Sequence, residues 1–290
     1  MFARFGKEAL FTASSLRNSD TKIKESGNAA YFREISRTSN RPVELLNNLA
    51  PKHRIYGLIE LDVTEARKFI SEHEVRTGEK LSFTSWVIKS IGQAVSEHSE
   101  VQAMKKGKKK LVVFNDVDVG IVIERQIGSE RGATTYCVRK ANEKSFRQIH
   151  DEIRLAQKSD VTVDGGSGEK PLTSVRVFSH LPDVLKKLYW RKIRSDPFLR
   201  KRLLGTVAVT AVGMFGKGGG WAIPVGLHSV VFALGGISTK LRNYANPDML
   251  GEFLNMTVMF DEEISLGAPA TRFLARLSEL MQSGYGLREE

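Results

Sequence analysis

Three consecutive acidic residues, Asp261, Glu262 and Glu263, stand between a strand-like segment and a helix-like segment. A carboxylate can act as a general base when burial raises its pKa. Its ordinary pKa of about 4.3 makes glutamate weaker than imidazole by about two units. No histidine occurs from residue 255 to residue 277. This position therefore provides either a glutamate base or no base.

The histidines elsewhere in the chain give no pattern for a metal. None forms an H-E-x-x-H motif or a pair at metal-ligand spacing, so no metal site is predicted. His53 and His228 begin predicted strands, and we keep both as candidates for substrate binding. The helical residues His73, His98 and His150 have charged neighbours, and we expect them to be solvated.

A glycine-rich stretch, MFGKGGGW at residues 214–221, invites comparison with a phosphate-binding loop. A Walker loop needs a serine or threonine after its lysine, because that hydroxyl reaches a magnesium ion. Here Gly218 follows Lys217, and no G-x-G-x-x-G motif stands between a strand and a helix. We therefore predict a flexible hairpin tip rather than a nucleotide site of either kind.

The net charge of the chain indicates which classes of molecule it can bind. The 290-residue chain has a formal net charge of +11 and a pI of about 9.7, which favours nucleic acid, a membrane surface or a phosphorylated ligand. Cys137 is the only cysteine, so there is no intramolecular disulfide, and we expect a cytoplasmic location rather than an organelle matrix. No apolar run reaches the roughly 18 residues that span a bilayer.

Residues 186–202 combine many cations with three aromatic side chains, Tyr189, Trp190 and Phe198. This composition suits a helix on a membrane surface or a phosphate-binding patch. It equally suits a solvated helical face whose aromatic side chains pack inward. No zinc finger or RNA-recognition signature accompanies it, so we expect no specific nucleic-acid partner.

Hydrophobic periodicity divides the chain into a basic N-terminal extension at 1–40 and a folded domain at 41–290, which contains a basic helical segment at about 169–204. Helices and strands alternate without a strict βαβ order, which favours an α/β sandwich with a mixed sheet. Strands are predicted at 55–63, 111–124 (two strands), 133–141, 205–213, 228–237 and 255–260. Helices are predicted at 64–78, 83–98, 145–157 and 181–204 (a pair broken at Pro197), with a last helix from Gly267.

Three sequence segments taken together indicate a protein family more specifically than any one of them does alone. These segments are GTVAVTAVGMFG (205–216), FALGGI (232–237) and LNMTVMFDEEISLGAPATRFLARL (254–277). Their combination resembles the catalytic domain of the acyltransferase component of 2-oxo acid dehydrogenase complexes, over residues 41–282. Compared with that family, the basic helical segment at about 169–204 is longer, and the resemblance therefore marks it as a basic insertion. The resemblance implies a chloramphenicol-acetyltransferase-like two-layer sandwich with a mixed β-sheet and helices. It also implies a stand-alone catalytic domain that forms a homotrimer or a larger cage, with the active site between two subunits.

In that family, a strand-end motif Asp-His-Arg-x-x-Asp-Gly-Ala supplies the chemistry. Its histidine takes the proton of a thiol, from coenzyme A or dihydrolipoamide, and a hydroxyl of a Thr-x-Ser-x-x-Gly strand stabilises the oxyanion. Asp261 matches the first aspartate, but Glu262 replaces the histidine and Leu266 replaces the second aspartate. Thr210 occupies the hydroxyl position. The resemblance thus places Asp261, Glu262 and Thr210 in the catalytic positions.

We therefore predict an acyltransferase-fold protein without standard coenzyme-A-dependent transfer: a pseudoenzyme that serves as an oligomeric scaffold or as a regulatory subunit of an active paralogue. It requires no cofactor, although an acyl–coenzyme A ligand can still bind through His53, His228, Gly213 and Lys217. One alternative is an active acyltransferase with Glu262 as base and Thr210 as oxyanion stabiliser. Another is a membrane- or nucleic-acid-associated structural protein, with peripheral membrane contact through 186–202.

Overall fold

The computed structural model describes residues 21–25, 28–32, 53–107, 110–127, 130–158, 182–212, 218–242, 249–265 and 267–287. The chain divides into two units, Met1–Pro42 and Val43–Glu290. In the first unit, β1 (Thr21–Glu25) and β2 (Asn28–Phe32) pair as an antiparallel hairpin. The N-terminal extension thus contains regular strands that the sequence analysis did not predict.

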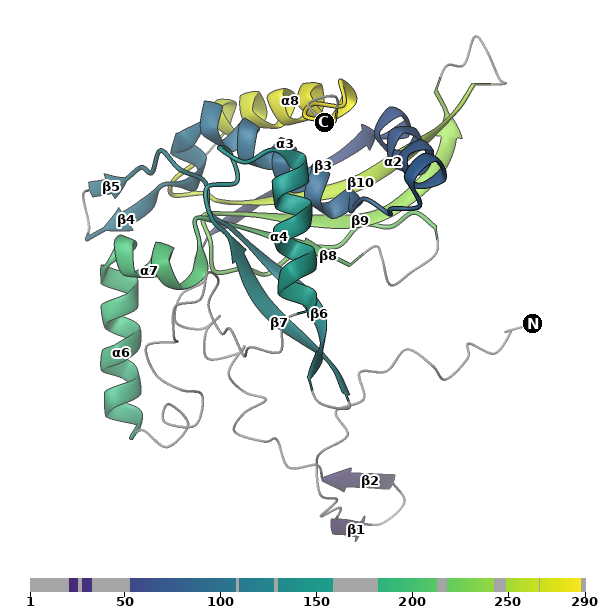
Figure 1. Ribbon diagram of the computed structural model, residues 1–290. Helices are drawn as coiled ribbons and strands as arrows, with labels where there is room; N and C mark the ends of the chain where they lie inside the picture. The colour runs from purple at the N-terminus through teal and green to yellow at the C-terminus, as the bar shows by residue number, and fades with distance from the viewer. Residues whose placement is uncertain are drawn as a thin grey trace. The chain divides into compact units, whose positions relative to one another are not determined.

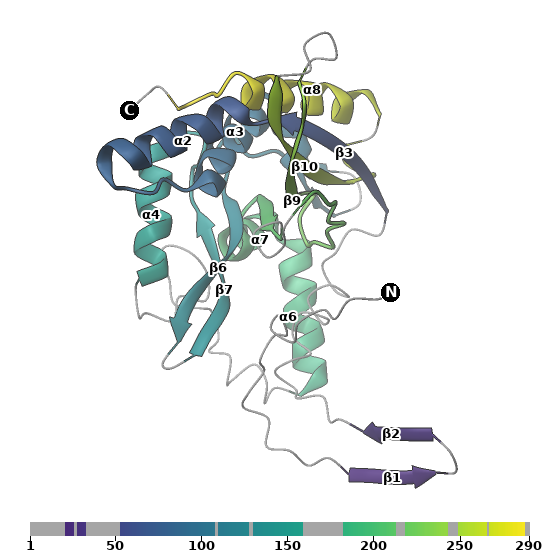
Figure 2. The same cartoon turned by 90° about the vertical axis from the view of Figure 1, so that its right-hand side faces the viewer.

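The second unit is built on a six-stranded sheet, in the order β3-β10-β9-β8-β6-β7 (Figures 1 and 2). Strand β8 runs parallel to β6 and β9, and the other pairs are antiparallel. The predicted mixed sheet is confirmed. The strands are β3 (Arg54–Asp62), β6 (Val119–Ile127), β7 (Glu130–Val138), β8 (Val207–Ala211), β9 (Val230–Leu241) and β10 (Leu250–Asp261).

Four helices form a layer on one face of this sheet (Figure 1). Alternate strand residues point into this layer, because successive side chains of a strand face opposite sides. Val258 and Phe260 of β10 belong to the main core, where Phe260 and Phe273 meet edge to face at 5.9 Å. The two-layer sandwich is confirmed. The helices are α2 (Thr64–Thr77), α3 (Phe83–Glu97), α4 (Phe146–Lys158) and α8 (Ala268–Gln282).

Two of these helices end and begin where local sequence signals predict. Gly78 closes α2 in a left-handed conformation, with φ of 75°, which glycine adopts without steric cost. The Ser82 side chain accepts a hydrogen bond from the Ser85 N–H at 3.3 Å and so caps α3. Helix α3 leads through a 3₁₀ turn (Ser99–Gln102) to a small hairpin of β4 (Met104–Lys106) and β5 (Lys110–Val112).

The basic insertion contains the helical pair that the sequence predicts. Helix α6 (Asp183–Ser195) and helix α7 (Pro197–Leu204) meet at Asp196. The Asp196 side chain accepts hydrogen bonds from the Phe198 and Leu199 N–H groups at 3.0 and 3.2 Å, and Pro197 occupies the first helical position. Within the described parts of the chain, no helix is both long and apolar enough to cross a bilayer.

An irregular segment at residues 218–228, which we call the strap, lies on the face of the sheet opposite the helices, the outer face. The Gly236 N–H of β9 donates to the Gly220 carbonyl at 2.9 Å. The two backbones are so close that a Cβ on Gly235 would lie 2.2 Å from the Gly220 oxygen. We predicted a flexible hairpin tip at 214–221; its described part, 218–221, instead belongs to a segment held against the sheet.

Candidate functional site

The acidic triplet occupies the turn between β10 and α8. The Asp261 N–H donates to the Ser229 carbonyl at 2.7 Å, and the Glu262 N–H donates to the His53 carbonyl at 3.2 Å. Asp261 is buried, whereas Glu262 and His53 are exposed. The described part of the chain thus brings Asp261, Glu262 and His53 together, but it does not bury Glu262 as a glutamate base requires.

Asp261 holds the turn together. Its side chain accepts the Glu263 N–H at 3.1 Å, and its carbonyl accepts the Ile264 and Ser265 N–H groups at 3.0 and 2.9 Å. Burial raises the pKa of Asp261, and the negative charge of Glu263 raises it further. Burial also lowers the pKa of the half-buried Arg200 to about 10, against the opposing attraction of Asp261. These contacts give Asp261 a structural role at the end of β10.

Thr210 lies far from this turn. It pairs with Ala233 of β9, which pairs with Thr257 of β10, so Thr210 and Thr257 are at the same level of the sheet. Glu262 lies five residues beyond Thr257, about 16 Å along the strand, and two strand spacings add about 10 Å across the sheet. A single copy of the chain therefore cannot place both residues on one carbonyl group.

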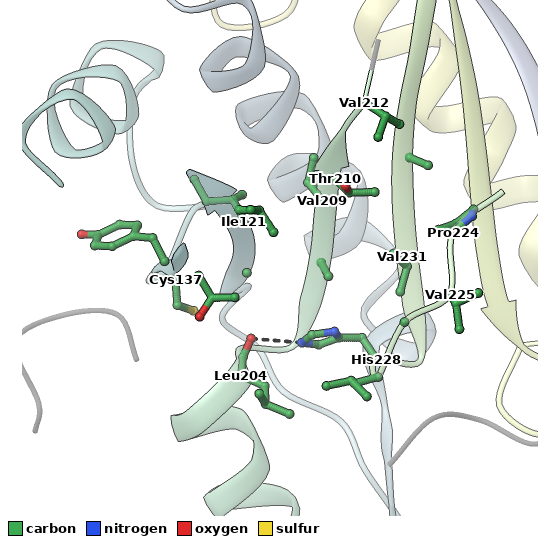
Figure 3. Close-up of a pocket in the computed structure, with 18 of the residues that line it drawn as sticks. Ile121, Cys137, Leu204, Val209, Thr210, Val212, Pro224, Val225, His228 and Val231 are labelled. Carbon is green, nitrogen blue, oxygen red and sulfur yellow. Dashed lines mark hydrogen bonds between the residues drawn. The ribbon is translucent and has the colours of Figure 1, made fainter. Parts of the chain in front are cut away.

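Thr210 instead lines a cavity of about 490 Å³ on the outer face (Figure 3). The floor comes from β6, β7, β8 and β9, and the walls come from the strap and the end of α7. Most of its lining is apolar, including Val122, Leu204, Pro224 and Val231. A cavity of this size and character suits a small or medium apolar ligand. No local sequence pattern indicates this cavity, because its lining comes from six different elements of the chain.

His228 is the main polar group of the cavity. Its Nε2 lies 3.0 Å from the Leu204 carbonyl oxygen, so Nε2 carries the proton and donates (Figure 3). Nδ1 is buried and has no hydrogen-bond partner within the described residues. Burial lowers the pKa of His228 to about 4, and the charge of Arg200 lowers it further. His228 is therefore neutral at pH 7 and has a lone pair on Nδ1 that can accept a hydrogen bond.

The candidate residues thus fall into two groups. Asp261, Glu262 and His53 meet at the β10 turn, whereas Thr210 and His228 line the cavity. Gly213, Lys217 and Leu266 lie outside the described residues. Placing His228 in a cavity with Thr210 required the three-dimensional structure, because no local pattern links residues from β8 and the strap.

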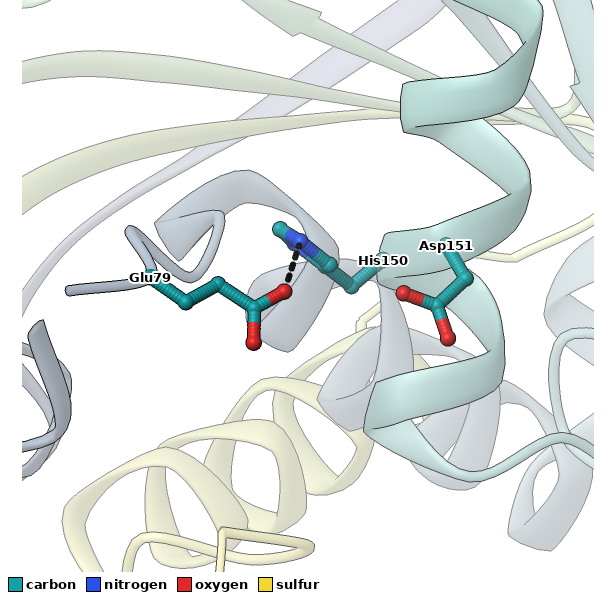
Figure 4. A group of neighbouring side chains, drawn as sticks. All are labelled: Glu79, His150 and Asp151. Carbon is teal, nitrogen blue, oxygen red and sulfur yellow. Dashed lines mark ion pairs between the residues drawn. The ribbon is translucent and has the colours of Figure 1, made fainter. Parts of the chain in front are cut away.

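A possible metal cluster joins Glu79, His150 and Asp151, whose ligand atoms lie within 4.8 Å of one another (Figure 4). The His150 Nδ1 already accepts the Ser82 N–H at 3.0 Å. Arg147 donates to both oxygens of Glu79, at 2.7 and 2.9 Å. A metal would have to displace these contacts, so the cluster is an ion-pair network that fastens α4 to the α2–α3 loop. The prediction of a solvated His150 is wrong, because the His150 side chain is only 3% exposed.

Comparison with protein families gives one match. Residues 47–160 match the model of the 2-oxoacid dehydrogenases acyltransferase (catalytic domain) family. The matched range includes β3 to β7 and α2 to α4, and it ends before β8, β9, β10 and α8. Comparison with curated protein sequences finds no match. The family's sequence pattern is therefore detected in a part of the chain that includes His53 but precedes Thr210, His228 and Glu262.

Solved structures match most of the chain. The probable dihydrolipoamide acetyltransferase of Listeria monocytogenes 4b F2365 is 15% identical, with a TM-score of 0.61 over 89% of this chain and 96% of that one. The cubic core of the pyruvate dehydrogenase multienzyme complex is 16% identical, with a TM-score of 0.61 over 87% and 91%. A truncated catalytic core of the 2-oxoacid dehydrogenase multienzyme complex from Thermoplasma acidophilum is 13% identical, with a TM-score of 0.60 over 87% and 98%.

These findings confirm the resemblance that the sequence predicts. At such low identities, the solved structures establish the fold, and the family match establishes the sequence pattern of residues 47–160. The chain has the fold of the dihydrolipoamide acetyltransferase cores, and its residues 47–160 carry the pattern of the 2-oxoacid dehydrogenase acyltransferase catalytic domain.

Proposed function

We propose that the protein assembles into a homotrimer, or a larger cage, through the outer face of its sheet. One observation carries this proposal: the outer face and its strap expose a set of large apolar side chains that a soluble monomer would normally cover. Each of these side chains is at least 38% exposed: Tyr56, Leu58, Val122, Val212, Trp221, Ile223 and Val225.

The separation of Thr210 and Glu262 supports the same assembly. The two residues occupy the catalytic positions of the family that this chain resembles, yet they are about 19 Å apart in one copy. They can meet only across a contact between copies. One structural neighbour is the cubic core of a multienzyme complex, which makes a cage a natural extension of the trimer.

Within this assembly we assign the protein a scaffolding or regulatory role, without standard coenzyme-A-dependent acyl transfer. Glu262 stands at the position of the family's base, and no hydrogen bond or ion pair orients its carboxylate among the described residues. Leu266 stands where the family's second aspartate would be. A general base that is not held in position loses most of the rate acceleration that proton transfer provides. Mixed trimers with an active paralogue are the regulatory form of this role.

Binding of an acyl–coenzyme A thioester is compatible with the loss of turnover. The apolar cavity suits an acyl chain, and the neutral His228 offers Nδ1 to a donor on the ligand. The excess of cations suits the phosphates of coenzyme A. The alternative is an active acyltransferase that uses Glu262 as base and Thr210 for the oxyanion, after a neighbouring copy has buried Glu262.

Assembly is tested by sedimentation velocity of the full chain. Leu58→Asp with Val122→Asp places two charges on the outer face and should dissociate the trimer to monomers. The control is Val75→Asp, because Val75 of α2 is equally apolar and 86% exposed but lies outside the outer face. A wild-type chain that sediments as a monomer at all protein concentrations contradicts the proposal.

Catalysis is tested by acyl transfer from acetyl–coenzyme A, and from longer acyl–coenzyme A thioesters, to dihydrolipoamide. We expect no turnover by the wild type and a gain with Glu262→His combined with Leu266→Asp, which restores the family's histidine and second aspartate. Glu263→Gln serves as the control for a neighbouring carboxylate. If the wild type turns over and Glu262→Gln alone abolishes turnover, the glutamate-base alternative is correct.

A further inference from the structure

Helix α6 carries a stripe of exposed apolar side chains. Val184 is 75% exposed, Leu185 is 48% exposed and Leu188 is 61% exposed. With 3.6 residues per turn, these three side chains lie on one side of the helix. Aliphatic side chains exposed next to one another on one helix face are characteristic of a binding surface rather than of an ordinary solvated helix.

The opposite side of the same helix is anchored to the protein. Trp190 and Ile193 are buried in a small cluster with Leu199, Leu203 and Leu227, from α7 and the strap. Figures 1 and 2 both show α6 extending away from the six-stranded sheet. The helix is therefore held on one side by its own core and presents its apolar stripe outward on the other.

Cations border this stripe. Lys187 and Arg191 follow one edge of the stripe, Lys192 continues the stripe one turn beyond Leu188, and all three are exposed. Residues 184–195 contain five lysines and arginines and no aspartate or glutamate. On the neighbouring helix α7, the 59% exposed Phe198 adds an aromatic ring, with Lys106 Nζ 5.8 Å from its centroid.

We propose that α6 docks the protein on an anionic phospholipid bilayer, with its axis parallel to the membrane surface. Val184, Leu185 and Leu188 enter the boundary between headgroups and acyl chains, while Lys187, Arg191 and Lys192 contact lipid phosphates. An apolar stripe bordered by cations is the pattern of interfacial helices. Three aliphatic side chains are a small anchor, so the attraction of the cations for an anionic surface must supply much of the binding.

Charge distinguishes this partner from two others. A second copy of the chain would bring another net charge of +11 toward the cations of α6, whereas an anionic bilayer attracts them. A nucleic-acid duplex would attract the cations but offers no apolar layer for the aliphatic stripe. The stripe shares no residue with the outer face that we assign to assembly, so docking does not depend on that proposal.

The experiment is co-sedimentation of the full-length protein with vesicles. One set contains phosphatidylcholine alone, and a second contains about one third phosphatidylserine to supply the anionic surface potential. We expect binding only to the second set, weakened by salt. Leu185→Ser with Leu188→Ser removes two of the three apolar side chains of the stripe and should abolish the salt-resistant part of binding. Lys187→Gln with Arg191→Gln and Lys192→Gln should weaken binding on the order of a hundredfold.

The matched control neutralises three exposed cations of the helix layer: Lys68→Gln, Arg76→Gln and Arg272→Gln. This control lowers the net charge by the same amount as the α6 variant. If the cations of α6 bind the membrane directly, the control should retain most of the binding. The proposal is overturned if the wild type does not sediment with anionic vesicles, or if this control weakens binding as much as the α6 variant does. It is also overturned if the Leu185 and Leu188 changes alter the molar mass without lipid, or if only a DNA duplex binds.

Discussion

The two faces of the six-stranded sheet are covered in different ways. The inner face is packed by α2, α3, α4 and α8, with Phe260 and Phe273 fully buried between the layers. The outer face is covered in part by the strap, which leaves a cavity and a set of exposed apolar side chains. Large buried side chains stabilise the inner face, whereas the outer face retains an open cavity and exposed apolar surface.

The largest expected loss of stability comes from the inner face. Phe273 contacts Phe232 and Phe260, with ring centroids 6.0 and 5.9 Å away, and it is fully buried. Phe273→Ala should lower the free energy of unfolding by about 3–5 kcal/mol, because it removes buried apolar area and leaves a cavity. Urea denaturation of the full chain measures this change. A loss below about 1 kcal/mol would contradict the tight packing of this face.

The second effect is a pH dependence from the outer face. His228 has a folded-state pKa of about 4, and its unfolded-state pKa is about 6.5. On acidification the unfolded chain therefore takes up this proton at a higher pH than the folded chain does. The free energy of unfolding is unaffected by His228 above pH of about 6.5 and falls as the pH drops toward about 4. The full loss is at most about 3 kcal/mol.

The measurement is denaturation of the wild type and His228→Gln across this pH window. The difference between the two pH profiles gives the contribution of His228 alone. It excludes the contributions of His150, whose pKa burial also lowers, and of Asp261, whose pKa burial raises. As the pH is lowered, the free energy of unfolding should fall less steeply in the variant than in the wild type. Equal pH profiles would show that His228 is not buried in its neutral form.

A third effect tests the strap. In Gly235→Ala, the new methyl group would lie 2.2 Å from the Gly220 oxygen, so the strap must move away from β9. The expected cost is about 1–3 kcal/mol, with faster hydrogen exchange at the Gly236 N–H. Gly220→Ala is the control, because a Cβ there meets nothing within 4 Å.

The alkylation rate of Cys137 is a second measure of the strap's displacement. Cys137 lines the cavity and is buried, and burial raises the pKa of its thiol to about 12. Alkylation in the native wild type should therefore be slow, since the thiolate is the nucleophile. Gly235→Ala should accelerate it by opening one wall. Unchanged alkylation and exchange rates would mean that the strap does not close the cavity.

The smallest intrinsic effect concerns the exposed side chains. Ile223→Ala removes a 58% exposed side chain of the strap, and in a monomer it should cost less than about 0.5 kcal/mol. If copies assemble through this face, the cost should grow with protein concentration, because assembly stabilises only the folded chain. Denaturation at several concentrations distinguishes these outcomes, and a concentration-independent cost would count against the interface.

Much of the local structure followed from the sequence alone. Alternation predicted β3 within a residue at each end, Gly78 and Ser82 predicted the end of α2 and the beginning of α3, and Pro197 predicted the break between α6 and α7. The combined segments also predicted the fold that the solved structures establish. The last strand was predicted too short, since β10 begins at Leu250.

Only the tertiary structure decided what the site contains. It separated Thr210 from Glu262, joined Thr210 and His228 in one cavity, held the strap against β9, and buried His150. The physical reason is the range of the interactions. Periodicity, caps and turns depend on residues a few positions apart, so the sequence determines them locally. Strand order and the cavity depend on contacts between segments that are distant along the chain, and no local pattern encodes those distances.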